Sequence, residues 1–191
     1  MRQRTLGVVL IALGLVGMLG IGWAFASGSD GYLAAPGWVP FGGIRGGPTC
    51  TPPTLPGQAV DVVLSDMGGM MSGGTMSGAR MMNVAASRSS IPAGDASFRV
   101  WNAGMMVHEL VVLPLPPDGV VGTRTVGSDG RVSEEGSLGE ASRTCGEGAG
   151  EGIAPGVAGW VILHLDPGRY ELICNLPGHY AAGMFTELDV R

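Results

Sequence analysis

The pattern of hydrophobic and polar positions divides the chain into three parts. Residues 6–26 are apolar without interruption, residues 27–57 show no period, and from Gln58 onward short hydrophobic runs are separated by turn residues. Short alternating runs bounded by Gly, Pro, Asp and Asn are typical of β-strands. The sequence therefore predicts strands at Ala59–Leu64, Asn83–Ala86, Ala96–Asn102, Glu109–Leu113, Gly159–Leu165, Arg169–Asn175 and Thr186–Val190.

Seven strands at this spacing predict an all-β fold, a β-sandwich of Greek-key type, over residues 58–191. The segments Pro92–Asp95 and Asp166–Gly168 have turn chemistry, because Pro presets φ and Gly accepts positive φ. A short helix is predicted within Ser133–Ser142. The 35 Gly and 13 Pro residues of the chain exclude a helical bundle, since both residue types are costly inside helices.

The N-terminal run predicts export. Arg2 and Arg4 precede the uncharged residues 6–26, which are long enough to span a bilayer, and few charges follow directly. Two interpretations stay open for residues 1–26: an uncleaved signal anchor, or a signal peptide cut after the A-x-A pattern Ala24–Ala26. The protein is expected at the cell membrane with its C-terminal domain extracytoplasmic, or secreted or periplasmic if cleaved. Residues 27–57, rich in Gly and Pro, are interpreted as a linker.

Charge excludes one class of partner. The net charge is −5, and no basic run follows the first few residues, so nucleic acid is not an expected partner.

One constellation near the C-terminus carries metal chemistry. Cys174, His179 and Met184 are separated by four residues each time, and His108 stands upstream at the start of a predicted strand. Two His and one Cys in a trigonal set with a weak axial Met define a blue-copper electron-transfer site. The thioether makes copper a better occupant than zinc. His164 lies in the middle of a strand without partner spacing and is not expected to be a ligand.

The remaining two cysteines are expected to pair. With Cys174 assigned as a thiolate, Cys50 and Cys145 are free to form a disulfide in an oxidising compartment. Alternatives remain: Cys174 as a buried structural thiol, and Met184 as core filler beside another axial ligand.

The protein is not expected to be an enzyme, because three His are too few for a multicopper oxidase and no catalytic triad, P-loop or dinucleotide motif is present.

The segments VHELVVL, EEGSLGEAS and GRYELICNLPGHYAAGM resemble the cupredoxin (type 1 blue copper) family, and within it sulfocyanin- and rusticyanin-like domains. The resemblance implies a monomeric domain that binds one type 1 copper through His108, Cys174, His179 and Met184 and exchanges single electrons with redox partner proteins. It also implies that His179 is an exposed edge with an apolar rim of Leu176, Pro177, Tyr180, Ala181 and Ala182. Glu109 stands where plastocyanins have a bracing Asn, and Asn175 is the candidate for that role.

A Met-rich segment, residues 66–82, contains six Met among Gly and Ser. Three interpretations stay open: a Cu(I)-capturing loop, a soft docking surface, and a variable insertion between two strands. The first gives an alternative function, a copper-handling protein (a chaperone, storage or tolerance factor).

Overall fold

The computed structural model describes residues 50–66 and 82–191. The predicted membrane segment at 6–26, the linker up to residue 49 and residues 67–81 of the Met-rich segment lie outside the described residues. Within the described ranges, no helix is both long and apolar enough to cross a bilayer.

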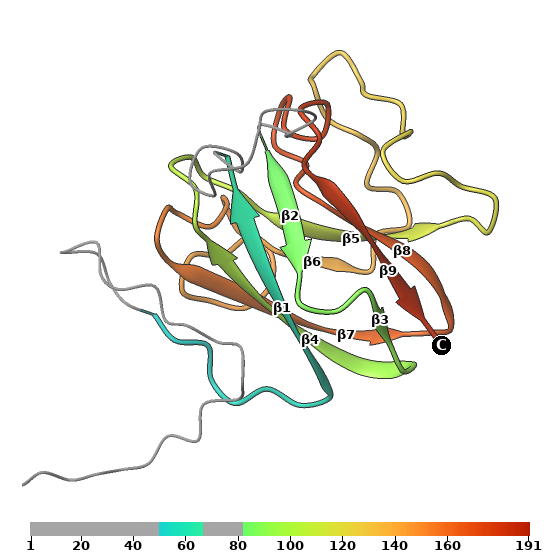
Figure 1. Ribbon diagram of the computed structural model, residues 1–191. Coiled ribbons are helices and arrows are strands. Elements are labelled where there is room, and N and C mark those ends of the chain that lie inside the picture. Colours follow the sequence, from blue (N-terminus) through green and yellow to red (C-terminus); the bar gives the residue numbers. More distant parts are fainter. Residues whose placement is uncertain (1–49, 67–81) are drawn as a thin grey trace, which may run out of the picture. The chain divides into compact units, whose positions relative to one another are not determined.

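The described residues form nine strands in two mixed sheets that pack face to face (Figure 1). The first sheet has the order β2-β1-β4-β7, and the second has the order β3-β9-β8-β5-β6. The strands are β1 (Gln58–Ser65), β2 (Asn83–Ala86), β3 (Ser90–Ile91), β4 (Gly94–Asn102), β5 (Leu110–Leu115), β6 (Gly139–Ala141), β7 (Ala158–Leu165), β8 (Gly168–Ile173) and β9 (Phe185–Val190).

Alternation along the strands builds the core between the sheets. On β1, Val60, Val62 and Leu64 are buried while the residues between them are only partly buried, and β7 shows the same period. Side chains of neighbouring positions on a strand point to opposite faces, so the buried set faces the other sheet. Phe98 and Val100 of β4 join this core and are fully buried.

β5 is buried on both faces. Leu110 and Val112 belong to the core between the sheets, whereas Val111 and Leu113 belong to a second cluster on the outer face. The residues that complete this outer cluster are Val132, Ile173, Tyr180 and the partly buried Phe185. The long segment between β5 and β6 therefore covers the outside of the second sheet beside the ligand-bearing loops.

The prediction of an all-β sandwich is confirmed, and the seven predicted strands are present with ends shifted by at most two residues. The short strands β3 and β6 were not predicted. The predicted helix within Ser133–Ser142 is wrong: this segment contains a turn and then β6, which pairs with β5. Gly136 and Gly139 have φ values of 79° and 145°, which a right-handed helix does not contain.

The predicted disulfide is present. Cys50 is bonded to Cys145, with 5.3 Å between their Cα atoms. Residues 50–55 form no strand, but the carbonyl of Pro56 accepts a hydrogen bond from the Ser97 hydroxyl. The end of the segment interpreted as a linker is thus attached to the domain by the disulfide and by the hydrogen bond at Pro56.

Candidate metal centre

Sheet topology brings three chain segments to one end of the sandwich. His108 lies two residues before β5, Cys174 directly follows β8, and Met184 directly precedes β9. These strands are antiparallel neighbours, with Ile173 paired to Val111 on one side and to Phe185 on the other. The start of β5, the end of β8 and the start of β9 therefore meet at the same end of the sandwich.

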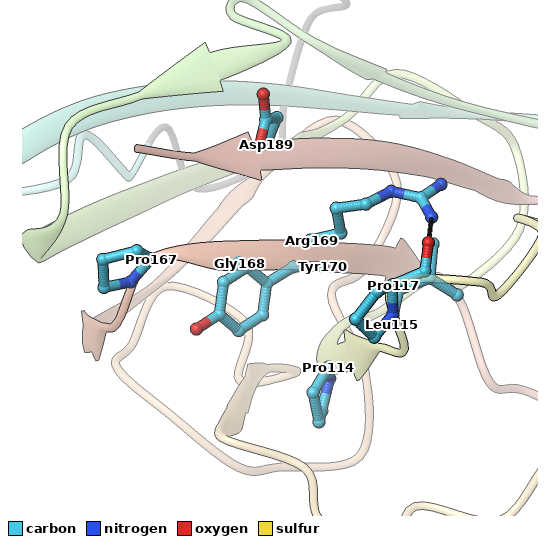
Figure 2. Close-up of a pocket in the computed structure, with 8 residues that line it drawn as sticks. All are labelled: Pro114, Leu115, Pro117, Pro167, Gly168, Arg169, Tyr170 and Asp189. Atoms are coloured by element: carbon cyan, nitrogen blue, oxygen red, sulfur yellow. Dashed lines mark hydrogen bonds between the residues drawn. The ribbon is translucent and has the colours of Figure 1, made fainter.

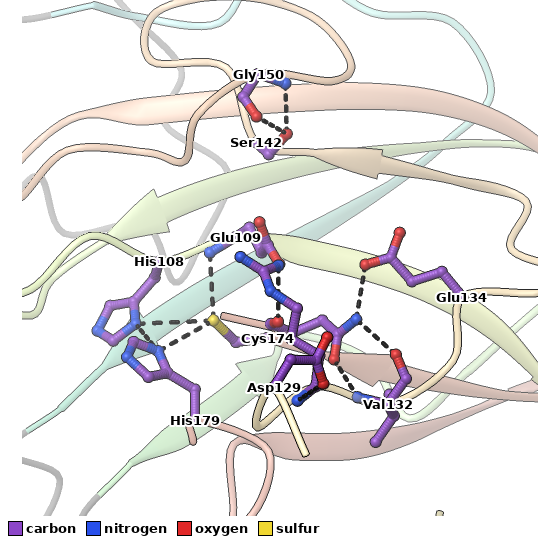
Figure 3. Close-up of polar contacts among 11 residues, drawn as sticks. His108, Glu109, Asp129, Val132, Glu134, Ser142, Gly150, Cys174 and His179 are labelled. Carbon is purple, nitrogen blue, oxygen red and sulfur yellow. Dashed lines mark hydrogen bonds and ion pairs between the residues drawn. The ribbon is translucent and has the colours of Figure 1, made fainter. Parts of the chain in front are cut away.

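The metal-binding atoms of His108, Cys174 and His179 face one another, as Figure 3 shows. The distance between the two Nδ1 atoms is 3.2 Å, and Sγ of Cys174 lies 3.3 Å from Nδ1 of His179 and 3.9 Å from Nδ1 of His108. The point equidistant from these three atoms is about 2.0 Å from each, close to the length of a metal–nitrogen bond and slightly short for metal–thiolate. The triangle has the size of a three-coordinate metal site.

Met184 closes the loop that carries the other two C-terminal ligand candidates. Its side chain is fully buried, its carbonyl accepts a hydrogen bond from the Cys174 N–H (3.0 Å), and its own N–H donates to the His179 carbonyl (3.1 Å). Gly178 has a φ of 83°, in the left-handed region that favours glycine, and this allows the chain to turn between Cys174 and His179. The spacing of four residues is thus folded into one compact loop.

Burial leaves the donor atoms uncharged when no metal is bound. It lowers the pKa of His108 to about 4, with a further lowering from His179 and an opposing effect of Asp66. Burial also lowers the pKa of His179 and raises that of Cys174 to about 12. The two imidazoles are therefore neutral and able to donate lone pairs, and a cation bound by the Cys174 sulfur must displace the thiol proton.

Two backbone groups stabilise a thiolate at Cys174. The N–H of Glu109 donates to Sγ over 3.4 Å, and a backbone hydrogen bond from Leu176 also opposes the rise in the Cys174 pKa. Hydrogen bonds to the charged form of a group favour that form. The chain thus supplies partial positive charge where a metal-bound thiolate would lie.

The segment before His108 is shaped by residues that sequence reasoning missed. Asn102 is fully buried, and its Nδ2 donates to the carbonyls of Met106 and Ile153, each over 2.7 Å. Asp66 accepts hydrogen bonds from the N–H groups of Met105 and Met106. Asp66 is far from His108 in sequence, and Asn102 is the last residue of β4. No sequence motif marks either residue.

Asn175 braces the ligand loop, as the sequence suggested. Its Oδ1 accepts from the Val132 N–H (2.8 Å), and its Nδ2 donates to the Val132 carbonyl (3.0 Å) and to Glu134 (2.7 Å). Arg131 donates to the Asn175 carbonyl and lies 3.9 Å from the Glu109 carboxylate. The brace therefore connects the Cys174 loop to the segment between β5 and β6, whose residues Val132 and Glu134 are labelled in Figure 3.

The predicted apolar rim needs one correction. Tyr180 is only 2% exposed and packs in the outer cluster, because its hydroxyl donates to buried Glu171 and accepts from the Arg124 N–H. Pro177 and Ala181 are exposed, whereas Leu176 and Ala182 are partly buried. The prediction that His179 is an exposed edge is wrong: the residue is buried, with 6% of its surface accessible. The accessible surface of His179 itself is thus small, whereas Pro177 and Ala181 beside it are exposed.

The remaining candidates lie outside this group. His164 is an exposed residue of β7 whose Nδ1 lies 2.7 Å from Asp95 on β4.

A hollow beside β8 is lined by Tyr170, Pro114 and Asp189 among others (Figure 2). Arg169, a cation in its lining, is engaged with Glu187 and with backbone carbonyls, Pro117 among them. The described residues of this hollow offer no metal-binding set.

The donors fit one type 1 copper ion. Two neutral imidazoles and a thiol that can ionise converge within 4.8 Å, and the buried Met184 thioether belongs to the same loop. Structural zinc takes four Cys or His ligands, whereas a His₂Cys set with Met is the donor set of blue copper.

No family model matches the chain, and neither does any curated protein. Among solved structures, reduced auracyanin from the photosynthetic bacterium Roseiflexus castenholzii is 15% identical, with a TM-score of 0.46 over 71% of this chain and 98% of that one. Auracyanin B is 23% identical, with a TM-score of 0.44 over 76% and 96% of the two chains. Rusticyanin from Thiobacillus ferrooxidans is 21% identical, with a TM-score of 0.43 over 71% and 79%.

Proposed function

We propose that this protein is an extracytoplasmic, membrane-associated type 1 copper protein that shuttles single electrons between redox partner proteins. The observation that carries the proposal is the convergence of His108, Cys174 and His179, all buried, with their donor atoms within 4.8 Å of one another. A bound copper ion would supply a one-electron couple between Cu(II) and Cu(I).

The chain's own residues suit this task because they form a stiff ligand frame. Cys174 would supply the thiolate, His108 and His179 the two imidazoles, and Met184 the thioether. The ligand loop is closed by hydrogen bonds between Cys174, His179 and Met184, and Asn175 attaches it to Val132. A frame that moves little when the metal changes charge gives a small reorganisation energy. A small reorganisation energy favours electron transfer.

Electrons would enter and leave beside His179. Its side chain is almost buried, while Pro177, Gly178 and Ala181 next to it are exposed. A small apolar surface around a nearly covered ligand allows close approach of a partner and excludes most water. Redox encounters use small, weak interfaces of this kind, which suits rapid turnover.

The expected location rests on two features. Residues 6–26 are apolar and follow two Arg, and this pattern is typical of an exported chain with an anchor or a signal peptide. The Cys50–Cys145 disulfide belongs to an oxidising compartment. Both support a domain that acts on the outer side of a membrane.

A second candidate function, copper handling, is favoured by two exposed thioethers. Met105 and Met106 are 76% and 47% exposed and lie just before His108. Soft thioether ligands on the surface suit Cu(I) that is passed on to another protein.

Copper loading of the full chain in detergent distinguishes the two functions. An electron carrier gives intense visible absorption and reversible voltammetry, and Cys174→Ser abolishes both. The matched control, Cys50→Ser/Cys145→Ser, keeps the absorption. Weak absorption, with ready release of Cu(I) to a chelator and affinity lost in Met105→Leu/Met106→Leu, would instead establish copper handling.

A further inference from the structure

Asp66 lies directly after β1 and faces the imidazole of His108. Its Oδ2 is 3.5 Å from Nε2 of His108, and the two side chains are 5% and 0% exposed. The same oxygen accepts the N–H groups of Met105 (2.8 Å) and Met106 (2.6 Å). The carboxylate is therefore held in place by the segment that leads into His108.

The two ring nitrogens of His108 have different surroundings. Nδ1 faces Cys174 and His179, whereas Nε2, on the far side of the ring, faces Asp66. In the described part of the chain, Nε2 has no hydrogen-bond partner at a shorter distance, although it is buried. The Asp66 carboxylate is thus the group placed to receive a proton carried by Nε2.

Gly104 makes this approach sterically feasible. A Cβ at position 104 would lie 2.8 Å from Nε2 of His108 and 2.9 Å from Oδ2 of Asp66. Real Cβ atoms essentially never come so close to other heavy atoms, so any larger residue would push the carboxylate and the imidazole apart. The absence of a side chain at Gly104 keeps the space between the two groups open.

We propose, building on the copper site proposed above, that Asp66 is a positioning residue that sets the tautomer of His108 and lowers the reduction potential of the centre. Its carboxylate retains the proton on Nε2, so the Nδ1 lone pair is directed at the metal. A carboxylate that accepts from the second nitrogen of a ligand His also raises the basicity of that ligand. Its negative charge, one imidazole away, favours the more highly charged Cu(II) state.

The first measurement uses the wild-type chain. Nitrogen-15 NMR of the metal-free and the Cu(I)-loaded protein should show the His108 proton on Nε2 and slow exchange of that proton with water. A proton on Nδ1 in the metal-free protein would overturn the proposal without any substitution. The metal-free arm of this measurement needs no copper, so it remains decisive if the chain does not bind copper.

The second measurement separates charge from structure. Asp66→Asn keeps an oxygen for the Met105 and Met106 amides but removes the charge. It should weaken Cu(II) binding about 10–100-fold, as is typical when such outer partners are lost. If Cu(I) affinity falls tenfold less than Cu(II) affinity, the potential rises by about 59 mV. Gly104→Ala, which leaves Asp66 unchanged, should raise the potential too.

Asp95→Asn is the matched control. Asp95 also bonds a histidine, His164, at 2.7 Å, but lies seven residues before Asn102 on β4, about 23 Å along the strand. The substitution Asp95→Asn removes the same charge from a carboxylate–histidine pair that is far from the proposed metal ligands. A potential that moves equally in Asp66→Asn and Asp95→Asn, or in neither, would contradict the proposal.

Discussion

The side-chain amide of Asn175 is hydrogen-bonded to both backbone groups of Val132. Its Oδ1 accepts the Val132 N–H over 2.8 Å, and its Nδ2 donates to the Val132 carbonyl over 3.0 Å. Asn175 follows Cys174 directly, so this pair attaches the ligand loop to the covering segment between β5 and β6. The brace is a property of one side chain and can be removed by one substitution.

Asn175→Ala should lower the free energy of unfolding by about 2–4 kcal/mol, because it leaves two buried backbone groups without partners. Denaturant unfolding measures the change. Glu134→Gln is the matched control: it retains an oxygen that can accept from Nδ2 of Asn175 and should cost less than about 1 kcal/mol. Equal losses in the two variants would show that Val132 is not held by Asn175.

The disulfide should contribute strongly to stability. Cys50 and Cys145 are 95 residues apart in sequence, and closing so long a loop restricts the unfolded chain. Cys50→Ser/Cys145→Ser should lower the free energy of unfolding by about 2–5 kcal/mol. Calorimetry of the variant and of the reduced wild type should give the same shift. A loss below about 1 kcal/mol in both would mean that the unfolded chain is already compact there.

Tyr180→Phe tests the buried network behind the ligand loop. The Tyr180 hydroxyl donates to Glu171 (2.9 Å) and accepts from the Arg124 N–H (3.0 Å), and Glu171 is fully buried. Removing the hydroxyl should cost about 1–3 kcal/mol in unfolding experiments, since both groups lose a partner in a buried site.

Tyr170→Phe is the control for Tyr180→Phe. The Tyr170 hydroxyl makes one hydrogen bond, to the Asp166 carbonyl, so its removal should cost only about 0.5–1.5 kcal/mol. A smaller loss for Tyr180→Phe than for Tyr170→Phe would contradict the network's role.

The pair formed by His164 and Asp95 should respond to pH. The hydrogen bond between His164 and Asp95 raises the pKa of His164 above its ordinary value of 6.5. The His164 imidazolium therefore persists to higher pH in the folded chain. The stabilisation by this pair is therefore present at low pH and fades as pH rises through the His164 pKa. In an NMR titration, Asp95→Asn should lower that pKa. An unchanged value would mean that the pair does not form in solution.

The strands followed from local pattern, whereas the short helix predicted within Ser133–Ser142 did not form. Alternation along β1 and β7 is visible in the sequence because each strand buries one face. β6 was missed because it has three residues and depends on pairing with Val111 and Val112 of β5. The Glu residues around β6 are typical of a helix, but the positive φ values of Gly136 and Gly139 suit a turn and a strand end.

By itself, the sequence determined the chemistry of the site. The spacing of Cys174, His179 and Met184 is local, and a loop of this length can bring a thiol, an imidazole and a thioether together wherever it lies. The assignment of Cys50 and Cys145 to a disulfide follows from the same reasoning, since it needs only a role for the third cysteine. Residue type and short-range spacing carry this information because metal ligands must be of particular kinds.

Only the tertiary structure decided what surrounds the ligands. The pairing of β5 with β8 places His108 beside Cys174, 66 residues apart in sequence. Asp66 follows β1 of the other sheet, so the packing of the two sheets brings its carboxylate within reach of His108. The burial of Tyr180 likewise depends on Glu171 and Arg124, which no local pattern connects to it. Such contacts arise from strand register and loop packing between distant segments, and a linear pattern contains neither.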